Sequence, residues 1–242
     1  MNLIFQLLLV LGVGIGLARV ALRAPARQAL WLVDQGLLVL LAALVGGRVG
    51  YVALNWDYFN LQRAEIVQVW LGGISGLGAA HGFVIGLCLS GLRPGARLGY
   101  LADSLAPLGL SLAVSAWLAA WWTGSAYGPF LEAGVGLPAR DESGAWAVRF
   151  PTQLVGALLT LGLWAGLDML ENKIKPARLT PGALAAVGLL GFSFLMVGLS
   201  FLRVDPLPVW RGLRVDAWAS LGLVAWELLG LAAVMLTRRR RS

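Results

Sequence analysis

The sequence predicts an all-α polytopic membrane protein with seven transmembrane helices, the N-terminus outside and the C-terminus in the cytoplasm. Of its 242 residues, 59% are hydrophobic and only 13% are charged, whereas an average soluble domain is roughly 45–50% apolar and about 25% charged. So few charges cannot cover a water-soluble globule of this size. The 32 glycines agree, because Gly is more frequent in transmembrane helices than in soluble ones.

Seven apolar stretches are long enough to cross a bilayer, which takes roughly 20 residues for a hydrocarbon core of about 30 Å. They cover residues 3–21, 29–53, 66–91, 102–122, 151–170, 182–201 and 216–236. The first stretch is not a signal peptide, because it lacks a basic start and a second span follows it instead of a cleavage site. Residues 1–242 are therefore predicted to form one seven-helix membrane domain.

Lys and Arg in the short loops set the orientation, because cytoplasmic loops carry an excess of them. One side carries basic residues at 19–27, 93–97, 173–178 and 238–241, and the other side carries about half as many. The first side is predicted to be cytoplasmic, with the basic tail 237–242 as an anchor to anionic lipid. The net charge of +7 is thus an orientation signal, and no nucleic-acid partner is expected. The longest loop, about 123–150, would form a small extracytoplasmic cap.

Ionisable residues inside spans are costly and are functional candidates. Arg48 lies near the outer end of the second stretch, after Gly46 and Gly47, which allow close helix approach. A guanidinium there could bind a phosphate by bidentate hydrogen bonds, or it could extend to the outer interface. His81 is the only histidine and follows a run of small residues in the third stretch. A buried imidazole could be a general base or a structural hydrogen-bond partner.

The later stretches offer fewer polar groups. Asp103 opens the fourth stretch and is predicted to cap that helix. Gln153 starts the fifth stretch on the outer side, where it could hydrogen-bond a lipid head group, while Glu227 lies near the middle of the seventh without a predicted partner. Arg203 belongs to an outer loop that is either a phosphate site or a solvated loop; its charged neighbours are Asp205, Arg211, Arg214 and Asp216. The sequence contains no metal-ligand motif, phosphate loop or nucleophile elbow.

Six short motifs, taken in order, resemble those of the prolipoprotein diacylglyceryl transferases of bacterial inner membranes. They are Gly46-Gly47-Arg48-Val49-Gly50-Tyr51, Trp70-Leu71-Gly72-Gly73-Ile74-Ser75, Ala102-Asp103-Ser104-Leu105-Ala106-Pro107, Gly124-Ser125-Ala126-Tyr127-Gly128, Pro151-Thr152-Gln153-Leu154 and Phe201-Leu202-Arg203. Each motif alone is weak, but their order on a seven-span frame with an outside N-terminus indicates membership of this family.

The resemblance implies transfer of diacylglyceryl from phosphatidylglycerol to the lipobox cysteine of a prolipoprotein in the bacterial plasma membrane. It implies that Arg48 and Arg203 bind the lipid phosphate and that His81 is a displaced general base. Head-group positioning would fall to Tyr51, Tyr127 and Gln153. No metal or organic cofactor is implied.

The chain departs from the family pattern at several polar positions. The family histidine of the third span falls on Leu77, and the family arginines of the fourth and sixth spans fall on Trp117 and Met196. Five further polar positions hold Ala120, Phe150, Val155, Gly156 and Ser200. An alternative function is therefore that of a catalytically degenerate relative that binds a lipid or a membrane partner. A receptor or transporter is a third possibility, but no broken-helix pair or repeat marks a transport site.

Overall fold

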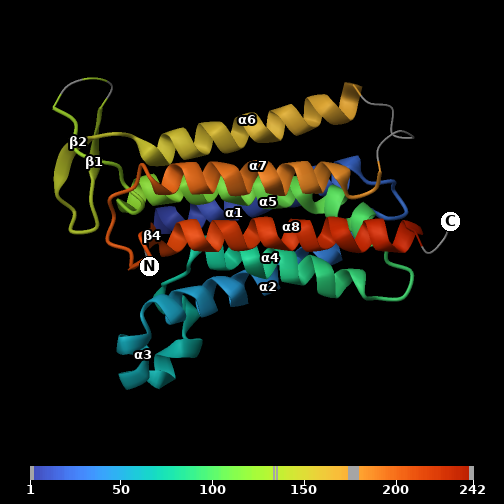
Figure 1. Cartoon of the computed structure of the whole chain (residues 1–242), viewed down its shortest axis with the longest axis horizontal. Coiled ribbons are helices and arrows are strands. Elements are labelled where there is room, and N and C mark those ends of the chain that lie inside the picture. The colour runs from blue at the N-terminus through green and yellow to red at the C-terminus, as the bar shows by residue number, and fades with distance from the viewer. Residues whose placement is uncertain (1–2, 133, 135, 174–179, 240–242) are drawn as a thin grey trace.

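Seven long helices run roughly side by side along the molecule (Figure 1). The structure is a computed structural model that describes residues 3–132, 134, 136–173 and 180–239, with side chains up to residue 229. The helices are α1 (Leu3–Arg23), α2 (Ala29–Leu54), α4 (Gly76–Gly91), α5 (Leu98–Thr123), α6 (Thr152–Lys173), α7 (Ala183–Ser200) and α8 (Val215–Arg239). The N-terminus and all strands lie at one end, the cap end, and α8 finishes at the other, the tail end.

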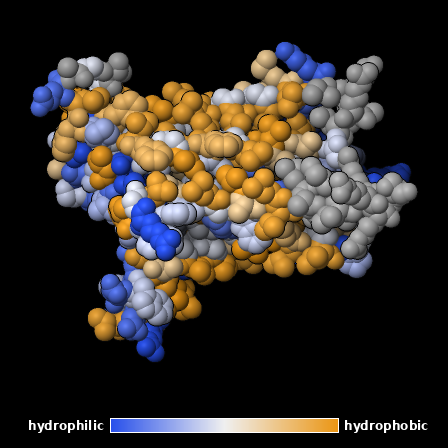
Figure 2. Space-filling model, viewed as in Figure 1, coloured by the Kyte–Doolittle hydropathy of each residue, from blue (hydrophilic) through white to orange (hydrophobic). Residues whose placement is uncertain are grey.

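The helices have the character of a multi-pass membrane protein. Among the described residues, α1, α2, α5, α6 and α7 are long and apolar enough to cross a membrane, while α4 has only 16 residues. Hydrophobic residues dominate the visible face of the bundle, and hydrophilic ones lie mainly at its two ends (Figure 2). The prediction of an all-α membrane protein is thus confirmed. Residues 240–242 of the predicted basic tail lie outside the described residues.

The predicted third span, 66–91, is not one helix, so its predicted boundary is wrong. A short helix α3 (Trp56–Leu61) leads into two 3-10 turns, η1 (Arg63–Val67) and η2 (Val69–Leu71). Gly72 and Gly73 then take φ values of +95° and +78°, which glycine adopts at little cost and which no α-helix permits. We call residues 62–75 the α3–α4 connection.

The sequence predicted that Asp103 caps its own helix, and this prediction is wrong because α5 begins earlier, at Leu98. Its carboxylate instead accepts hydrogen bonds from the backbone N–H groups of Gly182 at 2.6 Å and Ala185 at 2.8 Å. These N–H groups belong to the start of α7, where an acidic group satisfies free donors and the helix dipole. Asp103 therefore joins α5 to α7 at the tail end.

Close helix packing depends on small residues, as the sequence predicted for Gly46. A Cβ at Gly46 would lie 2.6 Å from the Gly78 carbonyl oxygen, and one at Gly82 would lie 2.3 Å from that of Ala42. Helices α2 and α4 therefore touch backbone to backbone. One apolar part of the interior joins α4 to α8; we call it the apolar cluster, and its buried members are Leu77, Trp117, Ala126, Ala157, Met196, Leu199 and Leu223.

The loop predicted as a cap contains a small antiparallel hairpin. Strand β1 (Leu137–Arg140) pairs with β2 (Trp146–Arg149), with Leu137 opposite Arg149. A second hairpin, β3 (Val209–Trp210) with β4 (Leu213–Arg214), lies between α7 and α8. The strands are largely apolar, but they bring Arg140, Arg149 and Arg214 to the cap end of the bundle.

Candidate functional site at the cap end

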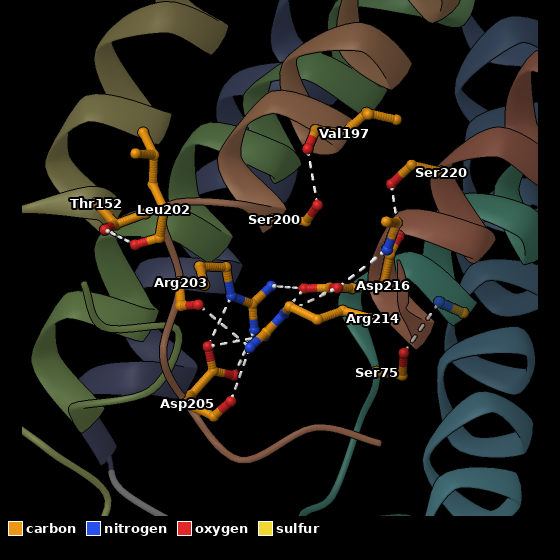
Figure 3. Close-up of polar contacts among 12 residues, drawn as sticks. Ser75, Thr152, Val197, Ser200, Leu202, Arg203, Asp205, Arg214, Asp216 and Ser220 are labelled. Atoms are coloured by element: carbon orange, nitrogen blue, oxygen red, sulfur yellow. Dashed lines mark hydrogen bonds and ion pairs between the residues drawn. The ribbon is translucent and has the colours of Figure 1, made fainter. Parts of the chain in front are cut away.

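Four charged side chains pair with one another in the segment between α7 and α8 (Figure 3). Arg203 forms two hydrogen bonds with Asp205, at 2.9 Å from Nε and 2.6 Å from Nη2, and its Nη1 lies 3.2 Å from Asp216. Arg214 reaches Asp205 at 3.1 Å and Asp216 at 3.2 Å. Both aspartate side chains are only 5% exposed. The charges of this four-charge cluster cancel.

Chain order explains the cluster. Arg203 follows the last turn of α7, and Asp216 lies in the first turn of α8, where an acidic residue is favoured by the helix dipole. Nη1 of Arg214 also donates to the backbone oxygens of Arg203, at 3.2 Å, and Asp205, at 2.9 Å. Burial lowers the pKa of Arg214, but hydrogen bonding and the charge of Asp216 outweigh burial and raise it above its ordinary value. Arg214 thus stays cationic.

Arg149, at the end of β2, is enclosed by aromatic rings. Its guanidinium carbon lies 4.6 Å from the ring centre of Tyr127 and 3.9 Å from that of Phe130. Nη2 donates to Asp141 at 3.1 Å, while the buried Nε has no hydrogen-bond partner among the described residues. The carbonyl of Tyr127 accepts from the backbone N–H of Val204 at 3.0 Å, which joins this stack to the four-charge cluster. Burial raises the pKa of Tyr127, so its phenol keeps its proton.

Gln153 completes this side of the site from the first turn of α6. Its side chain is 1% exposed, and its Nε2 donates to the backbone oxygen of Ser125 at 2.8 Å. Its Oε1 accepts no hydrogen bond from any described group. A buried amide oxygen of this kind can accept from a ligand hydroxyl.

The guanidinium of Arg48 donates hydrogen bonds to backbone carbonyl oxygens. Its Nε donates to Ile66 at 2.9 Å, its Nη1 to Gly72 at 2.6 Å and Gly73 at 3.0 Å, and its Nη2 to Glu65. All four acceptors are carbonyl oxygens of the α3–α4 connection, so four of the five N–H groups of this guanidinium are occupied. Figure 1 shows this segment projecting from the bundle beside α3. Arg48 is 6% exposed, and it does not extend into the interface.

Aromatic rings flank Arg48 as well. Its guanidinium carbon lies 5.9 Å from the ring centre of Tyr51 and 5.1 Å from that of Phe59. Tyr51 in turn packs against Gly73, where a Cβ would lie 2.4 Å from the ring. Tyr51 and Arg48 therefore hold the same backbone segment from two sides.

His81 lies in α4 with one ring nitrogen engaged. Nδ1 is 2.9 Å from the carbonyl oxygen of Leu77, which requires Nδ1 to carry the proton and leaves Nε2 as an acceptor. Nε2 faces α8, where a Cβ at Gly222 would lie only 3.0 Å away. In this tautomer the imidazole can accept a proton at Nε2.

Five of the positions that depart from the family pattern come together in space. Leu77, Trp117 and Met196 are buried members of the apolar cluster. Ala120 and Val155 are half-buried and pack against the same cluster. At these five positions the chain forms one hydrophobic core, in which the side chains pack against one another.

The sequence-predicted residues fall into three places. Tyr127, Gln153 and Arg203 meet at the cap end, whereas Arg48 and Tyr51 bind the α3–α4 connection and His81 faces α8. Sequence reasoning missed Arg149. The available signal was an arginine directly before the Phe150-Pro151 pair, in a loop that also contains Tyr127 and Phe130.

Acid is expected to loosen the β1–β2 hairpin. Hydrogen bonds, first from the Ser143 side chain and then from the N–H groups of Ala145 and Ser143, lower the pKa of Asp141 below its ordinary value. A carboxyl with a depressed folded-state pKa stabilises the fold above its unfolded pKa, about 4, and this contribution is lost as the pH falls through the folded value.

Hydrogen exchange at the Ala145 amide measures this effect. We expect its protection factor to fall as the pH is lowered below about 4 and to be low at neutral pH in Asp141→Asn. Equal protection in wild type and Asp141→Asn at neutral pH would show that Asp141 does not hold the turn.

The chain is similar to one family over nearly its whole length. A family model described as prolipoprotein diacylglyceryl transferase matches residues 3–234. Three relatives carry the name phosphatidylglycerol–prolipoprotein diacylglyceryl transferase. That of Streptococcus sanguinis is 27% identical over 180 residues, 72% of this chain and 68% of that protein. That of Azoarcus sp. is 30% identical over 223 residues, 85% and 77% of the respective chains. That of Nitrobacter winogradskyi is 44% identical over 78 residues, 31% and 27% of the respective chains.

Proposed function

This chain belongs to the prolipoprotein diacylglyceryl transferase family, and on that premise we propose that it moves diacylglyceryl from phosphatidylglycerol to the lipobox cysteine of a prolipoprotein. The observation that carries the proposal is the family match over residues 3–234. The position of Tyr127, Gln153 and Arg203 in neighbouring segments at the cap end supports it further.

The proposed topology has seven spans in the bacterial inner membrane, with the cap end outside and the tail end in the cytoplasm. The excess of basic residues in the loops at the tail end supports this orientation. The prolipoprotein and the head group of phosphatidylglycerol would then meet at the outer membrane surface, at the level of the β1–β2 hairpin.

The reaction forms a C–S bond and breaks a C–O bond. The cysteine thiolate attacks a glycerol carbon of the lipid, glycerol phosphate leaves with the electron pair of the C–O bond, and a base takes the thiol proton. His81 can serve as that base through Nε2. A cation beside the phosphate would stabilise the leaving group, and we assign this role to Arg203, which would have to share its guanidinium with Asp205 and Asp216. Tyr127 and Gln153 would bind the head-group hydroxyls.

Arg48 and Tyr51 have a different part in the proposal. With four N–H groups on backbone oxygens, Arg48 can offer a phosphate only one more hydrogen bond. Its larger contribution is to position the α3–α4 connection, and Tyr51 supports it by packing against Gly73.

Bacteria depleted of their own transferase provide the test. We expect expression of this chain to restore mature lipoprotein, and His81→Ala to abolish the rescue. Cys88→Ala is the matched control on the same helix, because Cys88 is exposed and has no part in the proposed chemistry. Failure of the well-expressed wild-type chain to restore lipoprotein would contradict the proposal.

A second candidate function is lipid or partner binding without catalysis. The specific observation in its favour is the apolar cluster, which occupies the positions where the family pattern is polar. This function predicts that purified protein binds phosphatidylglycerol but releases no glycerol phosphate when a lipobox peptide is added.

A further inference from the structure

Glu227 is a buried carboxyl group that the proposed chemistry does not use. It lies in α8, about 18 Å along the axis from the first residue of that helix, and it is 6% exposed. Neither carboxyl oxygen has a hydrogen-bond partner among the described residues. In α7, the fully buried Ser193 hydroxyl is also without such a partner.

Both groups lie on the tail side of the apolar cluster. Leu223 of α8 packs in that cluster with Met196 of α7. The two helices are antiparallel neighbours. Glu227 therefore lies about one turn beyond Leu223 on α8, and Ser193 lies about one turn beyond Met196 on α7, both toward the tail end. The carboxyl group is therefore buried inside the bundle, with the apolar cluster on its cap side.

No described cation neutralises this carboxyl group. Helix α7 contains no titratable residue over Ala183–Ser200. Helix α4 contributes His81, whose Nδ1 is bonded to Leu77 and whose Nε2 faces Gly222, and the exposed thiol of Cys88. At the start of α8, the charges of Arg214 and Asp216 are already paired within the four-charge cluster.

Desolvation strongly disfavours an unpaired ionised carboxylate in such a place, and binding a proton removes that penalty. We propose that Glu227 is a proton-binding site inside the helix bundle, and that α8 stays packed against α7 only while the proton is bound. The ligand is a proton, taken from water as the helices pack. Raising the pH removes it and places a charge in the apolar layer, so the packed state loses stability as the pH rises.

Infrared spectroscopy tests the proton directly. Purified protein in phosphatidylglycerol nanodiscs at neutral pH should show a carboxylic-acid C=O band that shifts in D₂O and is absent from Glu227→Gln. The control is Glu171→Gln, because Glu171 is 40% exposed and paired with Arg23 at 2.8 Å; this variant should keep the band. A spectrum in which Glu227→Gln removes no such band would overturn the proposal.

Thermal unfolding tests the coupling to packing. The Tm of the wild-type protein should fall between neutral and alkaline pH, while that of Glu227→Gln, whose side chain stays neutral, should stay constant over the same range. Identical pH dependence in the two proteins would overturn the coupling. The first experiment measures protonation of Glu227 and the second measures stability. Neither result depends on whether the chain is a transferase.

Discussion

Arg48→Ala is expected to release the α3–α4 connection and to destabilise the protein by at least about 3 kcal/mol. The guanidinium donates to four backbone oxygens of that segment, those of Glu65, Ile66, Gly72 and Gly73. The four acceptors are half-buried, and an acceptor that loses its donor away from water costs about 1–3 kcal/mol. Together the four losses give the expected total.

Arg48→Lys separates charge from geometry. Lysine keeps the charge but has three donors on one nitrogen, in place of the planar fork that reaches oxygens on two sides. We therefore expect Arg48→Lys to recover only part of the stability. Figure 1 shows α3 outside the bundle, so released backbone there becomes open to protease.

Thermal unfolding in detergent and limited proteolysis at residues 62–75 measure these effects. The matched control is Arg63→Ala in the same segment, because the Arg63 side chain is exposed and bonds only to Asn60. Arg63→Ala should change the free energy of unfolding by less than about 0.5 kcal/mol. If Arg48→Ala were as stable and as protease-resistant as Arg63→Ala, Arg48 would not hold the connection.

Asp205→Asn is the second large expected change, a loss of about 3–5 kcal/mol in the free energy of unfolding. Asp205 binds Arg203 through two hydrogen bonds and also pairs with Arg214. Without its charge, two largely buried guanidinium groups share only Asp216. The penalty is the cost of a buried charge left without its partner.

An exposed ion pair gives the control for this substitution. Glu171 pairs with Arg23 at the tail end, with side chains 40% and 29% exposed, and exposed pairs contribute about 0–1 kcal/mol. Chemical unfolding of both variants compares the two ion pairs. A loss in Asp205→Asn no larger than in Glu171→Gln would mean that the four-charge cluster is not a unit of stability.

The sequence predicted the helices well and one boundary poorly, for physical reasons. Hydropathy locates apolar runs, and six of the seven predicted stretches fall on single helices. The stretch 66–91 fails because hydropathy ignores backbone conformation: Gly72 and Gly73 take positive φ there, and Arg48 supplies the hydrogen bonds that a helix would have made. Asp103 fails as a predicted cap because its partner, the start of α7, is remote in sequence.

The site was predictable only where neighbours in sequence are also neighbours in space. Arg203, Asp205, Arg214 and Asp216 lie within one loop, so their proximity could be expected, but their mutual neutralisation depends on side-chain geometry. The enclosure of Arg149 needs a hairpin to place it between two rings. Family positions such as Leu77 and Trp117 were read from motif spacing, and their meeting in one apolar cluster appears only in three dimensions.

Diacylglyceryl transfer by this chain can be measured in a defined system. Purified protein in phosphatidylglycerol vesicles is mixed with a synthetic lipobox peptide, and mass spectrometry follows the peptide cysteine. We expect a peptide with diacylglyceryl on its sulfur and one glycerol phosphate released for each modified peptide. The rate should be at least about 100-fold lower in His81→Ala. Folded protein that binds the lipid and leaves the peptide unmodified would contradict the proposed transfer.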